Sequence, residues 1–187
     1  MDPYTQFADL IDKVQSLTQW DDALRPALIK VGYEKHLCDA MNGLFDAVDV
    51  PARLMHNDST LFDATFRNLK IEIKKAKCNF VLDLAKIHSS RHLPDLVFLF
   101  VCYGTTDRHA ISLHVVRPAD LYAQLMRDCH PGFVDYLDHL TRGTWFSTEI
   151  RQVQHQFHYS PKQLRTIARK RLRRSCRISK PRVVLSH

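Results

Sequence analysis

The sequence predicts an α/β domain, on the border with α+β, in which helices flank a mixed β-sheet. Three observations lead to this prediction. Apolar residues recur at helical spacing over residues 5–18. They alternate with polar residues over 61–75, which is the spacing of a strand. Residues 96–103 are apolar at almost every position, as in a strand buried on both faces. Helices and strands in this order are typical of a layered α/β unit.

Two helices are predicted before the sheet. The first covers residues 5–18. Asp21 and Asp22 are residues that commonly begin a helix, and they predict the start of a second, longer one. This second helix is expected to end near Gly43, and Pro51 excludes its continuation.

The sheet itself is predicted from 61–75 onward. Residues 61–75 are expected to form a β-hairpin that turns at Arg67-Asn68, because asparagine tolerates a positive φ. Residues 79–90 fit either a short helix or a loop. Residues 96–103 and 110–116 are separated by a short polar turn, which predicts an antiparallel pair of strands.

Two more helices are predicted after these strands. Pro118 is suited to the first turn of a helix over residues 118–129, and Ser160-Pro161 has the same character at the start of a final helix. The chain of 187 residues divides into a main domain, 1–160, and a basic C-terminal helix or tail, 161–187.

The charge of the protein is concentrated in this tail. Of the 27 Lys and Arg residues, ten lie from Pro161 onward, where there is no Asp or Glu. The first 160 residues hold the other 17 and all 20 acidic residues, so their net charge is −3. A basic tail without large apolar anchors indicates a polyanionic partner, with nucleic acid favoured over a membrane surface.

The composition also bears on the compartment. No apolar run approaches the roughly 20 residues that cross a bilayer, and Met1-Asp2-Pro3 does not resemble a secretory signal. The five cysteines are scattered, as in a protein with reduced thiols. We therefore expect a cytoplasmic protein.

Three residues of the hairpin carry the candidate chemistry. With a two-residue turn at Arg67-Asn68, Asp63 lies directly opposite Glu72, and facing Cβ atoms are about 5 Å apart. Two carboxylates so close repel each other unless a cation lies between them, and Mg²⁺ prefers oxygen ligands. Lys74 follows Glu72 by two residues and projects from the same face of the strand.

These residues resemble the PD-(D/E)XK nuclease motif, in which the acids and the lysine correspond to Asp63, Glu72 and Lys74. The resemblance covers roughly residues 25–130, because a helix precedes the hairpin and further strands and a helix follow. Phe62 stands where the motif has proline. The resemblance implies a restriction-endonuclease-like fold and Mg²⁺-dependent phosphodiester hydrolysis, with Mn²⁺ able to substitute. Asp63 and Glu72 would bind the metal, and Lys74 would assist the attacking water.

Alternatives remain at this site. Asp58 is a rival for Asp63 as the first metal ligand, since a longer turn would bring it to Glu72. Glu34 is a candidate accessory acid from the preceding helix. The alternative to a site is that the hairpin face is an ordinary charged surface without catalytic function.

Residues after the motif and in the tail are candidates for contacts with DNA, because their side chains suit phosphates and groove edges. They are Lys77, His88, Ser90, Arg91, His92, Arg165, Arg169 and Arg173.

The resemblance implies a type II restriction endonuclease, encoded by a prokaryote or a phage, that cuts double-stranded DNA as a homodimer. One alternative is a structure-specific repair or recombination nuclease of the resolvase kind. Another is a non-catalytic nucleic-acid-binding protein that acts through its basic tail.

Overall fold

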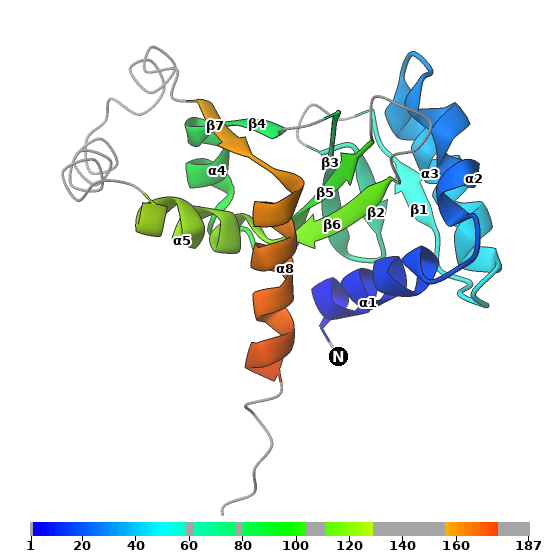
Figure 1. The fold of residues 1–187 in the computed structure, drawn as a ribbon. Helices are drawn as coiled ribbons and strands as arrows, with labels where there is room; N and C mark the ends of the chain where they lie inside the picture. The colour runs from blue at the N-terminus through cyan, green and yellow to red at the C-terminus, as the bar shows by residue number, and fades with distance from the viewer. Residues whose placement is uncertain (1, 59–61, 78–79, 104–110, 129–155, 176–187) are drawn as a thin grey trace, which may run out of the picture.

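A five-stranded mixed sheet forms the centre of the protein (Figure 1). The computed structural model describes residues 2–58, 62–77, 80–103, 111–128 and 156–175. The strand order is β1-β2-β3-β5-β6; only β3 and β5 are parallel, and the other neighbours are antiparallel. The strands are β1 (Leu54–His56), β2 (Ala64–Phe66), β3 (Leu69–Ala76), β5 (Leu96–Cys102) and β6 (Ser112–Val116).

Helices cover both faces of this sheet, as Figure 1 shows. The first face packs against α1 (Pro3–Gln15), α2 (Trp20–Leu28) and α3 (Tyr33–Asp46). The second face packs against α4 (Leu84–Ser90), α5 (Pro118–Asp128) and α8 (Pro161–Ser175). A separate two-stranded sheet pairs β4 (Phe80–Asp83) with β7 (Gln156–Tyr159). The predicted α/β class with a mixed, helix-flanked sheet is confirmed.

Alternation along β3 divides its side chains between the two faces. Leu69, Ile71 and Ile73 belong to the first core, beneath α1, α2 and α3. Glu72 and Lys74 point the other way, because a strand turns successive side chains to opposite faces. The long apolar strand β5 divides in the same way and is buried on both faces, as its composition predicted.

The predicted hairpin register is confirmed. Phe66 pairs with Leu69 across the two-residue turn. The positive φ, however, belongs to Arg67 (55°) and not to Asn68. A turn with positive φ at its first central residue also suits the twist of a hairpin.

The prediction of one long second helix is wrong, because the chain breaks between α2 and α3. Gly32 takes a left-handed conformation (φ 64°) directly before α3, where glycine costs little strain. The side chain of Lys75 on β3 stabilises the break, since its Nζ donates to Leu28 O at 2.8 Å at the end of α2. Ile29 and Val31, expected to be helical, are exposed.

Both edges of the five-stranded sheet are covered by a side-chain amide. Gln15 on α1 accepts the N–H of Leu113 at 3.0 Å and donates to its carbonyl at 3.2 Å, on edge strand β6. Asn42 on α3 does the same for Leu54 on β1, at 2.8 and 2.9 Å. Edge strands leave backbone groups without partners, and these two amides supply them. The three-residue β1 was not predicted from the sequence.

The basic C-terminal helix begins as predicted. Ser160 Oγ accepts the N–H of Gln163 at 3.3 Å, and Gln163 Oε1 accepts the N–H of Ser160 at 2.9 Å, which is a capping box. Leu164 and Ile167 are buried in the second core. The first two turns of α8 are therefore part of the packed domain, although its composition suggested an appendage.

Within the part of the chain that the structure describes, no helix is long and apolar enough to cross a membrane.

Candidate active site

Asp63 lies immediately before β2, where the ladder between β2 and β3 ends. Its backbone N–H donates to Ile71 O at 3.0 Å. Its carboxylate oxygen Oδ2 accepts the backbone N–H of Ile73 at 2.6 Å. The Asp63 side chain thus replaces the backbone of β2 as the partner of β3, and this bond fixes the carboxylate beside that strand. Continuing the register by one step places Asp63 opposite Glu72, as the sequence predicted.

Glu72 is a buried carboxylate, only 3% exposed, on the second face of β3. Glu72 and Lys74 pair with Phe98 and Phe100 of β5, both of which belong to the second core. Two ammonium groups, Lys74 Nζ and Lys86 Nζ, contact the same oxygen of Glu72, Oε1. Burying an ionised carboxylate costs free energy unless opposite charges compensate it. The two lysines supply this compensation.

The surroundings of Asp63 raise the pKa of its carboxyl. Burial is the largest cause, because it removes water from the charged form. The hydrogen bond from Ile73 acts in the opposite direction and lowers the pKa. The negative charge of Glu72 raises it, and the positive charge of Lys74 lowers it. These charges interact because Asp63, Glu72 and Lys74 lie together at one site.

Glu34 also reaches this site, from the first turn of α3. Its charge makes a smaller contribution to the raised pKa of Asp63. The centroid of the neighbouring Tyr33 ring lies 3.8 Å from Lys75 Nζ, so the start of α3 packs against a side chain of β3. A glutamate within the predicted helix before the hairpin was the only sequence signal for this residue, and it could not show the proximity.

Asp58, the rival first ligand, lies away from these charges. Its side chain is 98% exposed, and its carboxylate is 3.5 Å from His56 Nδ1. These features are those of a solvent-exposed turn residue. The geometry therefore favours Asp63 over Asp58.

The acids can be tested for their fit to a metal. Among the described residues, no three His, Cys, Asp or Glu side chains gather closely enough to hold an ion. Mg²⁺ requires less, because it is commonly bound by one or two carboxylates together with waters and substrate phosphates. The pair Asp63 and Glu72 matches this requirement, while Glu34 contributes only its charge to the surroundings of Asp63. Lys86 was not identified as a partner of Glu72 from the sequence.

Only part of the predicted DNA-contacting set after the motif is at the surface. Lys77 and His92 are exposed. His88 and Ser90 are buried within α4 and its neighbours, at 3% and 5% exposure. This burial argues against the predicted contacts of these two residues with DNA. The two side chains are buried because residues 84–90 form a packed helix and not an open loop.

Arg91 is half-buried and joins α4 to α5. Its Nη1 lies 2.7 Å from His88 Nδ1, and its guanidinium lies 5.1 Å from the ring centroid of Tyr122. These contacts occupy the Arg91 side chain within the protein, in the absence of DNA.

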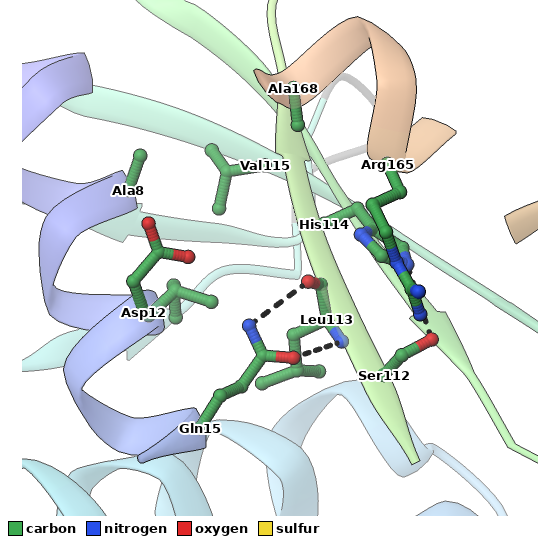
Figure 2. Close-up of a pocket in the computed structure, with 10 residues that line it drawn as sticks. Ala8, Asp12, Gln15, Ser112, Leu113, His114, Val115, Arg165 and Ala168 are labelled. Atoms are coloured by element: carbon green, nitrogen blue, oxygen red, sulfur yellow. Dashed lines mark hydrogen bonds between the residues drawn. The ribbon is translucent and has the colours of Figure 1, made fainter. Parts of the chain in front are cut away.

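Arg165 lines a pocket of about 350 Å³ between α1, β6 and α8, shown in Figure 2. It faces His114, which is buried and 3.1 Å from the Ser112 hydroxyl. Burial, with a contribution from the charge of Arg165, lowers the pKa of His114 to about 4. His114 is therefore neutral near pH 7. Arg165 itself is exposed, as a contact with DNA would require.

Arg169 and Arg173 follow Arg165 along α8. Their side chains lie outside the described residues.

Comparisons of the chain with protein-family models, with curated proteins and with solved structures find no match. The function is therefore inferred from the residues and their geometry.

Proposed function

We propose that this protein is a Mg²⁺-dependent DNA endonuclease with Asp63, Glu72 and Lys74 at its active site. The observation that carries the proposal is the buried Glu72 carboxylate, adjacent to Asp63 and in contact with Lys74. A buried carboxylate is costly, so its presence next to a second acid is better explained by function than by stability.

The fold gives further support to this proposal. A helix, α3, precedes the hairpin, and β5, β6 and α5 follow it in the order that the PD-(D/E)XK resemblance implies. The proposal therefore includes a restriction-endonuclease-like core. It also includes a homodimer, because two-fold symmetry suits the cutting of both strands at a palindromic site.

Each side chain of the site has a role in hydrolysis. Bound Mg²⁺ would supply positive charge to the reacting phosphate and lower the pKa of an attacking water. Asp63 and Glu72 would hold the ion, and the bond from the Ile73 N–H keeps the Asp63 carboxylate oriented. The Lys74 ammonium would position the water and stabilise the negative charge that develops on the phosphate.

The test is cleavage of supercoiled plasmid DNA by the purified protein with Mg²⁺. We expect E72Q and K74M to lose about 10²–10⁴-fold in rate, the usual contribution of such groups. K70M is the matched control: Lys70 lies on the same strand and face, where it pairs with Asp95 at 2.7 Å. If E72Q and K74M cut as fast as K70M and the wild type, this site is not catalytic.

A second comparison separates the two kinds of nuclease. Branched and linear DNA of equal sequence should be cut alike by a restriction enzyme that recognises the sequence. A strong preference for the branched substrate would instead support the resolvase-like alternative.

A further inference from the structure

Lys86 is a second lysine at the site, and it comes from a different element than Lys74. It lies on α4, while Glu72 and Lys74 lie on β3. The Glu72 side chain is 4% exposed, but those of Lys74 and Lys86 are 34% and 37% exposed. Each ammonium therefore contacts a buried carboxylate, while part of its own side chain is open to solvent.

The two ammonium groups occupy one of the two oxygens that Glu72 could offer to a metal. A carboxylate oxygen has two lone pairs, and Glu72 Oε1 already contacts two N–H donors. The formal charges of Asp63, Glu72, Lys74 and Lys86 cancel. A divalent cation held between the two acids would add two positive charges beside both lysines, and this repulsion favours the movement of one ammonium away from the site.

The positions of the two lysines differ in how easily they can move. Lys74 is two residues from Glu72 on the same face of one strand, so its side chain stays beside the acid. Lys86 reaches the acid from a helix across the site, through a flexible four-carbon chain. Rotation of this chain carries the Lys86 ammonium towards solvent, where a bound polyanion would lie.

We propose that Lys86 is an exchangeable counter-ion of Glu72, which the divalent metal displaces and which then binds a DNA phosphate. This inference rests on the proposed nuclease function. It assigns Lys86 a positioning role: the lysine holds Glu72 without metal, and it links metal binding to DNA binding.

The first test measures metal binding without DNA, by electron paramagnetic resonance titration with Mn²⁺. K86M should bind Mn²⁺ at least about fivefold more tightly than the wild type, because the competing ammonium is gone. K77M is the control, since it removes an exposed lysine that follows β3 and precedes the helix of Lys86. K86Q serves as a second neutral variant if K86M does not fold.

The outcomes distinguish the two proposals. Equal Mn²⁺ affinities in the wild type, K77M and K86M would overturn the exchange and leave the nuclease proposal standing. If neither the wild type nor K86M binds Mn²⁺, the proposed function itself is wrong.

The second test measures the salt dependence of DNA affinity, with Ca²⁺ and with EDTA. With Ca²⁺, the log–log slope of the wild type should exceed that of K86M by about 0.9, the value of one phosphate contact. With EDTA the slopes should agree, because Lys86 remains on Glu72. In an E72Q background, which releases Lys86 without metal, the difference should appear in EDTA as well.

A slope difference of the same size in EDTA and in Ca²⁺ would overturn the exchange, because Lys86 would then be a permanent phosphate contact. A purely structural lysine would change the stability of K86M but not this dependence on metal.

Discussion

The two faces of the sheet differ in the side chains that they bury. Within the described ranges, the core beneath α1, α2 and α3 is formed by hydrophobic residues, with the Tyr4 hydroxyl and the Cys38 thiol among their few polar atoms. Among the residues that the structure describes, the buried side chains of polar or charged residues belong to the other side, on β3, α4 and β6: they are Glu72, His88, Ser90 and His114. The same five strands thus support one face built for stability and one that retains costly polar groups.

This difference identifies the buried side chains that stability alone does not explain. Apolar burial contributes about 25 cal/mol per Å² of surface, and the first face gains this without burying an ionised side chain. A buried charge such as Glu72 contributes little net stability even when paired. The polar groups of the second face are therefore the ones that need a functional explanation, and Glu72 lies at the proposed active site.

The largest expected effect is on the first face. F66A should lower the free energy of unfolding by about 3–5 kcal/mol, because it leaves a cavity in a close-packed core. The centroid of the Phe66 ring lies 5.1 Å from the ring centroid of Phe7 and 6.0 Å from the ring centroid of Phe45. Chemical denaturation measures the change. A cost below 1 kcal/mol would show that this face is not the main source of stability.

On the second face, L164A should cost about 2–5 kcal/mol, because Leu164 is fully buried between α8 and the sheet. R165A, its exposed neighbour, should change stability by less than about 0.5 kcal/mol. Denaturation curves of the two variants test whether α8 is part of the domain. Equal and small effects would mean that the helix is a detachable tail. A deletion after Ser160 is consequently a poor test of DNA binding, because it also removes core residues.

Adjacent residues of β3 allow the sharpest test of the two faces. I71A, on the first face, should cost about 2–5 kcal/mol. E72M, on the second face, should stay within about 1 kcal/mol of the wild type, because it removes the buried charge and leaves only the partly exposed ammonium groups of Lys74 and Lys86. Lys74 and Lys86 can turn to solvent in this variant. If E72M destabilises as much as I71A in denaturation experiments, the cluster is structural and the distinction between the faces fails.

The smallest effect is a pH dependence at Asp63. Its pKa is raised in the folded protein above the usual 3.8, chiefly by burial, so the folded state binds this proton more tightly than the unfolded state. The resulting stabilisation is present below about pH 3.8 and is lost as the pH rises through the folded pKa. D63N keeps an acceptor for the Ile73 N–H but cannot titrate.

The stability of the wild type relative to D63N should therefore fall in EDTA as the pH rises above about 3.8, and then level off once the pH passes the raised pKa. Thermal unfolding at a series of pH values measures this. A relative stability that rises with pH would show that the Asp63 pKa is lowered, contrary to its burial.

Much of the hairpin could be predicted because its determinants are local. A two-residue turn and alternating side chains fix the register, so the facing positions of Asp63 and Glu72 follow from the sequence alone. The strand at 96–103 and the helix that begins at Pro161 have equally local signals, in an apolar run and in the Ser160-Pro161 pair.

The remainder depends on contacts between distant segments. The contact of Lys86 with Glu72 needs the parallel pairing of β3 with β5, because that pairing brings α4 back across the sheet. The approach of Glu34 needs the break at Gly32, which a continuous apolar spacing concealed. Strand β1 has only three residues, too few for a periodic pattern.

The amides of Gln15 and Asn42 have a consequence for association. Each occupies the outward N–H and C=O of one residue near the start of an edge strand, Leu113 on β6 and Leu54 on β1, so a foreign strand would have to displace it before pairing there. Two helices of the same layer therefore protect both ends of the sheet against growth into larger β-assemblies. Any pairing of two copies of this protein is accordingly expected to use its helices or loops, not a shared sheet.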